Sequence, residues 1–324
     1  MKILQLSSSL TGGAGLAALR LNEALVQEGL DSQIFSREDI DLQFSPLKNR
    51  ILVKRFGSKV VTFVQIPGRI SKNLLVTPIN INFSDSILEK FSKESFDIVH
   101  IHSTYNLLST KGLLKLTNKF RNIILTLHDE RLLTGGCHYT SGCLGFESQC
   151  IGCPQTKKLF RTLIRNNFRI TRNAFENSDN FVLKIISPSH WLANQCKKSS
   201  IFGGQEVYVI RNAIPDQFFT EDTKCYSEQN VQIVRLGFAS SELQNPYKGL
   251  NLLLKTLEGI DDKFPNRFEL RLLGSGVINT KLKSVSRFKS KNDNETINFL
   301  DNIDILVVPS YQDNLPNVML EALS

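Results

Sequence analysis

Residues 309–324, PSYQDNLPNVMLEALS, close the chain and predict a phosphate-binding helix that follows a strand. Asp313 and Glu321 lie eight residues apart, which is roughly 12 Å along a helix axis. Pro316 suits the first turn of a helix, where a backbone N–H is not needed. Local chemistry alone fits a simple capped helix equally well, with Asp313 or Asn314 accepting hydrogen bonds from free amides. The stretch therefore predicts a helix, whose start either binds a phosphate or is simply capped by a side chain.

Eight short apolar runs, of which DILVVPS at 304–310 is the last, alternate with longer segments of helical periodicity. The other seven runs are 1–6, 96–102, 122–128, 182–189, 207–213, 233–239 and 268–274. Strands separated by helices predict parallel sheets built from βαβ units, with ligand sites at the carboxyl ends of the strands. Residues 205–230 become polar and lose their periodicity. We therefore predict an α/β protein with two Rossmann-like, doubly wound domains, 1–207 and 208–324, that face a cleft.

Length and composition are typical of a soluble globular protein. The 324 residues suit about two domains, and 41% are apolar while 22% are charged. A formal charge of +8 favours anionic partners such as nucleotides, lipid phosphates or a membrane surface. The start, MKILQLSSSLTGGAG, does not have the pattern of a signal peptide, and no stretch reaches the ~18 apolar residues of a membrane-spanning helix. We expect a cytoplasmic protein in which the six cysteines are reduced.

A glycine-rich turn lies between the first strand and a helical pattern at Leu16–Gln27. Gly12, Gly13 and Gly15 would let the backbone approach a phosphate at the start of this helix. A tight turn without a ligand explains the glycines about as well. The spacing is not G-x-G-x-x-G and no acidic residue follows at the distance of a ribose contact, which argues against a dehydrogenase.

The closing stretch resembles the acidic-x7-Glu signature of the family 4 glycosyltransferases, which are retaining enzymes of the GT-B fold. Other segments resemble further motifs of this family and follow in the same order. They are TGGAG (11–15), DIVHIH (97–102), LTLHD (125–129), ISPSHWL (186–192), VIRNAIPDQF (209–218), YKGLNLLLKTL (247–257) and LLGSG (272–276). Their co-occurrence over nearly the whole chain is far more specific than any one of them.

The resemblance implies a nucleotide-sugar site in the C-terminal domain. Lys248 would neutralise the donor diphosphate and stabilise the leaving group electrostatically. Asp313 would hold hydroxyl groups of the transferred sugar, with the amides of Asn314 and Leu315 nearby. Glu321 would bind the ribose of the nucleotide.

The resemblance also implies contributions from the N-terminal domain, where Gly12 and Gly13 would approach the diphosphate and His128 would lie near the transferring sugar. One departure from the family pattern is the absence of an arginine shortly before the Lys-Gly pair. The second cation would then be replaced by the helix dipole or by Arg235. Aspartate in place of the usual glutamate at 313 is a milder departure.

The implied activity is that of a hexosyltransferase-type enzyme that moves a sugar from a nucleotide-sugar to a glycan or lipid-phosphate-linked acceptor, with retention and without a catalytic metal. Bacterial surface polysaccharide synthesis, in the cytoplasm or on the inner face of the membrane, is the expected setting. One alternative is a non-catalytic remnant of such an enzyme. Another is a metal-stabilised nucleic-acid-binding protein, although no recognition motif accompanies the charge and we expect no nucleic acid partner.

Four cysteines gather in CHYTSGCLGFESQCIGCP, where Cys137, Cys143, Cys150 and Cys153 fall within seventeen residues. A Cys-x2-Cys pair fits one tetrahedral metal, so we predict a structural zinc site that orders this loop. His138 is an alternative ligand, and disulfides or free thiols are alternative states. Four protein ligands would leave no open position for catalysis.

Two basic regions favour an anionic surface. No Asp or Glu occurs from Leu42 to Ser84, a segment that contains Lys48, Arg50, Lys54, Arg55, Lys59, Arg69 and Lys72. A second stripe holds Arg161, Arg165, Arg169 and Arg172, beside an apolar arc of Phe160, Ile164 and Phe168. Such faces suit an anionic membrane or a lipid-phosphate acceptor. A helix packed on its sheet with a solvated basic rim is an equal alternative.

The chain ends three residues after Glu321, whereas a doubly wound domain ordinarily continues into another strand. We therefore expect a C-terminally truncated enzyme whose second domain is incomplete. The strand at 304–310 would then be an exposed apolar edge, which is an association hazard.

Overall fold

The computed structural model describes residues 1–37, 76–77, 82–176, 182–219, 233–290 and 292–324. The chain divides into two compact units, Met1–Ala213 (unit 1) and Ile214–Ser324 (unit 2). This division falls six residues beyond the predicted boundary after residue 207. Each unit has its own parallel sheet, so the predicted α/β class is confirmed.

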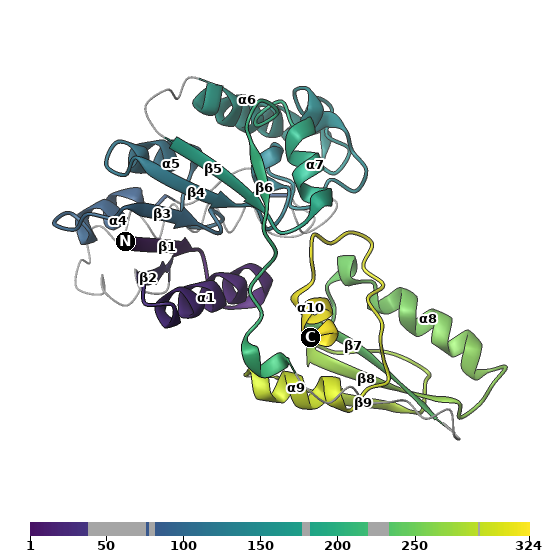
Figure 1. Cartoon of the computed structure of the whole chain (residues 1–324). Coiled ribbons are helices and arrows are strands. Elements are labelled where there is room, and N and C mark those ends of the chain that lie inside the picture. Colours follow the sequence, from purple (N-terminus) through teal and green to yellow (C-terminus); the bar gives the residue numbers. More distant parts are fainter. Residues whose placement is uncertain (38–75, 78–81, 177–181, 220–232, 291) are drawn as a thin grey trace, which may run out of the picture. The chain divides into compact units, whose positions relative to one another are not determined.

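Unit 1 contains a six-stranded sheet with the order β2-β1-β3-β4-β5-β6 (Figure 1). Its strands are β1 Lys2–Ser7, β2 Asp31–Ser36, β3 Ile98–Ile101, β4 Asn122–Thr126, β5 Val182–Ser187 and β6 Val207–Val209. Every pairing in this sheet is parallel. The order reverses at β1, which lies between β2 and β3. The loops after β1 and β3 therefore diverge, and such a switch point is where open parallel sheets bind ligands.

Helices and short turns connect these strands. They are α1 Gly12–Gln27, α4 Ser84–Lys90, α5 Thr110–Thr117, α6 Arg161–Glu176 and α7 His190–Lys198, with the 3₁₀ turns η1 Arg131–Leu133, η2 Gly145–Glu147 and η3 Lys158–Phe160. One continuous core packs the helices against the sheet, and its largest fully buried side chains include Phe91, Phe168 and Phe202. Burial of each such ring stabilises the fold by roughly 1.5–3 kcal/mol.

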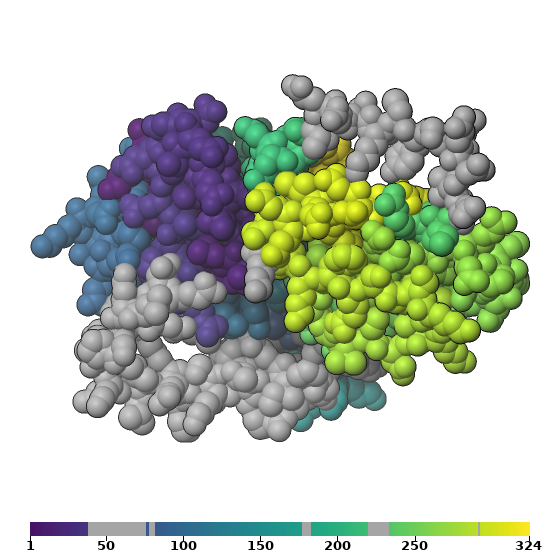
Figure 2. Space-filling model, turned by 90° about the horizontal axis from the view of Figure 1, so that it is seen from below, coloured from purple at the N-terminus to yellow at the C-terminus, as the bar shows by residue number. Residues whose placement is uncertain are grey.

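Helix α1 begins at Gly12, four residues before the helical pattern that the sequence suggested. Within its first turn, Gly15 lies in close contact with the preceding loop, because an added Cβ would lie 2.5 Å from the Ser9 carbonyl oxygen. The β1–α1 loop therefore passes directly against the helix. The outer face of α1 contributes to the purple surface of unit 1 in Figure 2.

Unit 2 contains a four-stranded parallel sheet with the order β10-β7-β8-β9. Its strands are β7 Val234–Glu242, β8 Phe268–Ser275, β9 Val285–Phe288 and β10 Ile305–Leu306. Its helices and turns are η4 Asp216–Phe218, η5 Pro246–Lys248, α8 Leu250–Asp261, α9 Asp293–Asp301 and α10 Asn317–Leu323. Because β7 lies between β10 and β8, this sheet also has a switch point, and the loops after β7 and β10 flank it.

The two faces of this sheet have separate cores, which follow from the alternation of side chains along β8. Phe268, Leu270 and Leu272 point to one face and pack with the apolar stripe of α8. Leu273 points to the other face and packs with Phe299 of α9. Figure 1 shows α8 and α9 on opposite faces of the sheet.

The strands predicted from the sequence need four corrections, all at sheet edges: two predicted strands are shorter and two strands were not predicted. The strand predicted at 207–213 covers only Val207–Val209, and that predicted at 304–310 covers only Ile305–Leu306. The edge strands β2 and β9 were missed altogether. An edge strand lies next to solvent, so it needs no continuous apolar run to be stable. In the described part of the chain, no helix is long and apolar enough to cross a membrane.

Candidate active site

Lys248 ends a short turn at the carboxyl edge of the unit 2 sheet. Asn245 Oδ1 accepts a hydrogen bond of 3.1 Å from the amide of Tyr247 and so caps η5. The Lys248 amide donates to the Asn245 carbonyl at 3.1 Å. The turn therefore places Lys248 between β7 and α8, beside the switch point.

Gly249 brings this turn against the end of β10. Its φ is 75°, and an added Cβ would lie 2.1 Å from the Pro309 carbonyl oxygen. The Tyr311 amide donates to the Tyr247 carbonyl at 2.8 Å, which joins the same two loops. Glycine is thus required here because backbone from two distant parts of the sequence meets at this point.

We expect Gly249→Ala to destabilise unit 2 by roughly 1–3 kcal/mol, because the added methyl group meets a carbonyl oxygen and φ is unfavourable for alanine. Chemical denaturation followed by circular dichroism measures the effect. Gly259→Ala on α8 is the matched control, since no described atom lies within 4 Å of its Cβ position. The control should be neutral or stabilising by up to about 1 kcal/mol. Equal stability of the Gly249→Ala protein and the wild type would contradict the argument.

The side chains of Lys248 and Asp313 form an ion pair, although they are separated by 65 residues in the sequence. Both are mostly shielded from solvent, with 25% and 17% of the side chain exposed. Ser310 Oγ donates to Asp313 Oδ2 at 3.2 Å, and the Asn314 amide donates to Oδ1 at 3.1 Å. The structure therefore brings together two predicted site residues, and it uses the predicted Asn314 amide to hold Asp313.

Two more predicted residues follow in the same segment. Leu315 lies between Asp313 and α10, and Glu321 lies within α10. The Glu321 side chain is only 7% exposed. A carboxylate is rarely so buried without polar partners, so Glu321 belongs to an ordered polar environment.

The suggestion that Arg235 supplies a second diphosphate cation is wrong. Arg235 lies at the amino-terminal end of β7, whereas Lys248 follows the carboxyl end. Its guanidinium makes two contacts with the carboxylate of Asp304, Nη2 to Oδ1 at 2.5 Å and Nε to Oδ2 at 3.1 Å. This pairing lowers the pKa of Asp304. Arg235 therefore fixes the base of β7 to β10.

In unit 1, Gly12 and Gly13 begin α1 next to the switch point. Both are exposed, and no described atom lies within 4 Å of a Cβ built on either. The first turn of α1 contains no acidic residue. A helix start with free space and no negative charge is suited to an anion, and the diphosphate contact stays a prediction.

His128 follows β4 and belongs to a chain of polar side chains that crosses three strands. Its Nε2 lies 3.3 Å from Nδ1 of His102, which follows β3. His102 Nε2 lies 2.7 Å from Oε1 of Gln5 on β1. Because Oε1 only accepts, His102 Nε2 donates, and His102 Nδ1 accepts the proton of His128 Nε2. The arrangement thus sets the tautomer of His128. No motif in the sequence indicates this role for Gln5.

Burial keeps these rings neutral. It lowers the pKa of His128 to about 4 and that of His100 to about 3. Burial, with the neighbouring His100 and His128, also lowers the pKa of His102 well below its usual value. His100 Nε2 is 2.7 Å from the Thr126 hydroxyl. The chemistry open to His128 is therefore hydrogen bonding by a neutral imidazole.

Unit 1 should lose stability in acid. An unfolded histidine has a pKa near 6.5, so below this pH the unfolded chain binds protons that the folded chain excludes. The contribution of each buried histidine to the free energy of unfolding is fully present above pH 6.5 and is lost as the pH drops toward 4. Between pH 7 and 5 the free energy of unfolding should fall by roughly 1–2 kcal/mol per ring. Urea unfolding at both pH values, followed by the fluorescence of Trp191 in α7, measures it.

A matched pair of variants tests the source of this acid sensitivity. His100→Gln keeps a polar partner for Thr126 and removes one titrating ring, so the pH dependence should shrink. His190→Gln removes an exposed histidine and should leave the pH dependence unchanged. Identical behaviour of the two variants would refute the assignment.

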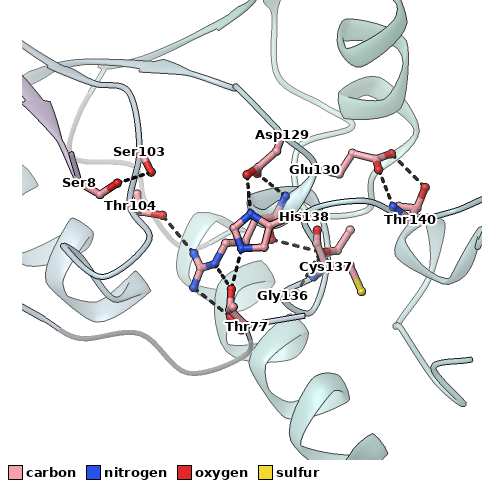
Figure 3. Close-up of polar contacts among 12 residues, drawn as sticks. Ser8, Thr77, Ser103, Thr104, Asp129, Glu130, Gly136, Cys137, His138 and Thr140 are labelled. Atoms are coloured by element: carbon pink, nitrogen blue, oxygen red, sulfur yellow. Dashed lines mark hydrogen bonds and ion pairs between the residues drawn. The ribbon is translucent and has the colours of Figure 1, made fainter. Parts of the chain in front are cut away.

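A second polar network follows β4 and was not foreseen (Figure 3). Asp129 Oδ2 lies 2.6 Å from His138 Nδ1, and His138 Nε2 lies 2.9 Å from the Thr77 hydroxyl. Glu130 accepts two hydrogen bonds from Thr140, as the dashed lines show. Both ring nitrogens of His138 thus have protein partners, and its alternative assignment as a metal ligand stays a prediction.

The four cysteines of the loop lie close enough to affect one another. Cys137 and Cys153 hydrogen-bond, which is the main reason that the pKa of Cys153 falls to about 6 and that of Cys137 rises. Burial raises the pKa of Cys150 to about 12. These thiols, with Cys143, are free. Across the described ranges, however, no group of three or more His, Cys, Asp or Glu side chains is arranged to hold a metal ion.

The zinc site thus stays a prediction. We expect about one zinc per chain in protein purified under reducing conditions, measured by elemental analysis, because four thiols suit one tetrahedral ion. Cys153→Ser should remove the metal and expose the loop to protease. Cys196→Ser, in α7, should keep it. A metal-free wild-type protein would contradict the prediction.

Helix α6 carries the predicted arginine stripe, but its apolar arc is not on the surface. Ile164 and Phe168 are fully buried in the core of unit 1. Arg161 Nε donates to the Cys153 carbonyl at 3.2 Å, and Arg172 pairs with Glu176. The apolar part of the membrane interpretation is therefore wrong for α6, which packs on its sheet with a basic rim.

The other basic region is not part of the described structure. Lys48, Arg50, Lys54, Arg55, Lys59, Arg69 and Lys72 all lie outside the described residues.

Two doubly wound units, each with polar residues gathered at a switch point, have the architecture of the GT-B fold. A crystal structure of an S. aureus TarM mutant with Fondaparinux, α-GlcNAc-glycerol and UDP has a similar fold, with a TM-score of 0.54 and 11% identity. That similarity covers 100% of this chain and 84% of TarM.

The sequence profile of Glycosyltransferase Family 4 matches residues 11–218. The chain therefore belongs to this family, which confirms the predicted resemblance and a transferase activity. It is also 23% identical over 343 residues to WcaC of Escherichia coli (strain K12), whose name describes a colanic acid biosynthesis glycosyl transferase. The match covers 100% of this chain and 81% of WcaC.

Proposed function

We propose that the protein transfers a hexose from a nucleotide-sugar to a glycan or lipid-linked acceptor, with retention at the anomeric carbon, in bacterial surface polysaccharide synthesis. The observation that carries this proposal is the Lys248–Asp313 ion pair at the switch point of unit 2. It supplies a cation for a diphosphate and a carboxylate for sugar hydroxyls side by side. The names of WcaC and of the UDP-containing TarM structure support the polysaccharide setting and the donor class.

The chemistry assigned to these residues is electrostatic. As the bond from the anomeric carbon to the diphosphate breaks, negative charge develops on the diphosphate, and Lys248 stabilises it. A departing phosphate oxygen takes the proton of the acceptor hydroxyl, which attacks from the same face of the sugar. His128 and Asp313 hold sugar hydroxyls and keep the anomeric carbon in place. Glu321 binds the ribose, and the start of α1 at Gly12 and Gly13 approaches the diphosphate.

A ligand screen followed by product analysis tests the proposal. UDP and other nucleoside diphosphates, with their sugars, are added to the full chain, and the melting temperature is recorded. A stabilising nucleotide-sugar is then incubated with a panel of glycan and lipid-linked acceptors. We expect stabilisation by at least one nucleoside diphosphate and a product with the anomeric configuration of the donor, assigned by NMR. An inverted product would exclude retention, and no response to any nucleotide would exclude the donor site.

A further inference from the structure

A small polar cavity in unit 1 has no role in the donor site. Its volume is about 60 Å³. Three elements supply the polar part of its wall, the loop after β3, the amino-terminal end of α5 and the middle of α6, together with Arg131 of η1. The polar lining residues are Thr104, Ser109, Thr110, Arg131, Asn167 and Thr171.

Arg131 is the charged group of this cavity and is only 8% exposed. Its Nε donates to the Thr77 hydroxyl at 2.8 Å, Nη2 to the Thr77 carbonyl at 3.1 Å and Nη1 to the Thr104 hydroxyl at 3.2 Å. Figure 3 labels Thr77 and Thr104, the two residues that accept these hydrogen bonds. A guanidinium has five N–H groups, so two have no protein acceptor among the described residues.

No carboxylate of the described residues forms an ion pair with the Arg131 guanidinium. Glu130, the adjacent residue, accepts hydrogen bonds from Thr140 with both carboxylate oxygens. Asp129 accepts from the Arg131 backbone amide at 2.8 Å and pairs its other oxygen with His138. Burial lowers the pKa of the Arg131 guanidinium by more than the charge of Asp129 raises it. An anion that contacts the guanidinium directly would therefore stabilise its charged form.

The remaining groups of the wall suit the same kind of ligand. Thr110 is the first residue of α5, whose start carries a partial positive charge and has no acidic residue in its first turn. The hydroxyls of Thr110 and Thr171 lie 3.0 Å apart, and Thr171 Oγ1 also donates to the Asn167 carbonyl at 3.0 Å. Thr110 is therefore the hydroxyl that can turn its proton toward a ligand. Leu108, Leu113 and Phe175 form the apolar part of the wall. The cavity has room for one tetrahedral oxyanion.

We infer that the Arg131 cavity is a subsite for a phosphate group of the acceptor. The inference rests on the proposed glycosyltransferase function and assigns a chemical class to its acceptor. The loops that form the cavity follow β3 and β4, the strands that also lead to His102 and His128. A phosphate held there would anchor the acceptor at the carboxyl edge of the unit 1 sheet, where His128 lies.

Isothermal titration of the full chain with inorganic phosphate tests the subsite. The titration uses the Lys248→Ala variant, so that phosphate does not bind to the donor cation instead. We expect saturable binding. Arg131→Gln should weaken it by at least about tenfold, because a charge-assisted contact is lost. Thr110→Val, a nearly isosteric change at the start of α5, should weaken it by about threefold, because one donor is lost. Asn167 of α6 also lines the cavity.

The matched control is Arg165→Gln, which removes an exposed arginine from the same helix and should leave phosphate affinity unchanged. Competition by glycerol phosphate, compared with vesicles that contain phosphatidic acid, shows whether a soluble or a lipid-linked phosphate reaches the cavity. Equal affinity of the Thr110→Val and Arg165→Gln proteins, or absence of saturable binding, would overturn the inference.

The donor function is tested separately by the binding of UDP to the chain with Lys248 intact. Binding of UDP without binding of phosphate would refute the subsite alone. Binding of phosphate without binding of any nucleotide would refute the donor function and leave an anion site in unit 1.

Discussion

Lys248→Ala should lower kcat/KM for the nucleotide-sugar by roughly 10²–10³-fold, because a positive charge beside the departing diphosphate is lost. Nucleoside diphosphate affinity should fall by roughly 1–3 kcal/mol, the usual range for charge-assisted hydrogen bonds. The structure adds a second cost. Lys248 is the ion-pair partner of Asp313, so its removal leaves a largely buried carboxylate near the position expected for the diphosphate. Initial rates and titration calorimetry with UDP measure the two effects.

One further variant separates the effect of the charge from that of the side-chain geometry, and a second is its control. Lys248→Arg keeps the charge and should retain part of the nucleotide affinity. Lys255→Ala removes an exposed lysine from α8, the helix that follows the same turn, and should behave as the wild type. Glu321→Ala should weaken nucleotide binding by a similar 1–3 kcal/mol through the ribose. Unchanged nucleotide affinity in both Lys248→Ala and Glu321→Ala would show that the donor site lies elsewhere.

His128→Ala should reduce kcat by roughly 10–100-fold while nucleotide affinity stays nearly unchanged, because His128 is assigned to the transferring sugar and not to the nucleotide. The loss corresponds to one or two hydrogen bonds that a neutral imidazole makes near the reacting carbon. The neutral state follows from the pKa of about 4. Single-turnover rates, compared with UDP affinity in the same protein, separate the two quantities.

The pH dependence gives a second test of His128. The ring of His128 is neutral above about pH 5. The pH profiles of kcat for the wild type and for His128→Ala should therefore have the same shape near pH 6.5. His190→Ala, which removes an exposed histidine of the same unit, is the control and should keep full activity. A His128→Ala protein with normal kcat would mean that His128 has no part in the reaction.

The central strands could be predicted from the sequence because they are buried on both faces. β1, β3, β4, β5, β7 and β8 each correspond to a continuous apolar run, which a buried parallel strand requires. The edge strands could not be predicted as well. β2 and β9 carry polar side chains, and β6 and β10 are shorter than their apolar runs. Their pairing depends on a neighbour distant in sequence, so no local pattern sets their ends.

The candidate site likewise has features that the sequence predicts and features that only the folded structure sets. The sequence alone determined the family and the alternation that gives two parallel sheets, and it predicted Lys248 and Asp313 as separate site residues. Only the tertiary structure decided that these two side chains pair, that Arg235 is bound to Asp304, and that Gln5 sets the tautomer of His128 through His102. A motif records the residue types that a local segment needs. An ion pair or a hydrogen-bonded chain depends on which strand ends lie side by side, and that is set by the strand order of the folded sheet.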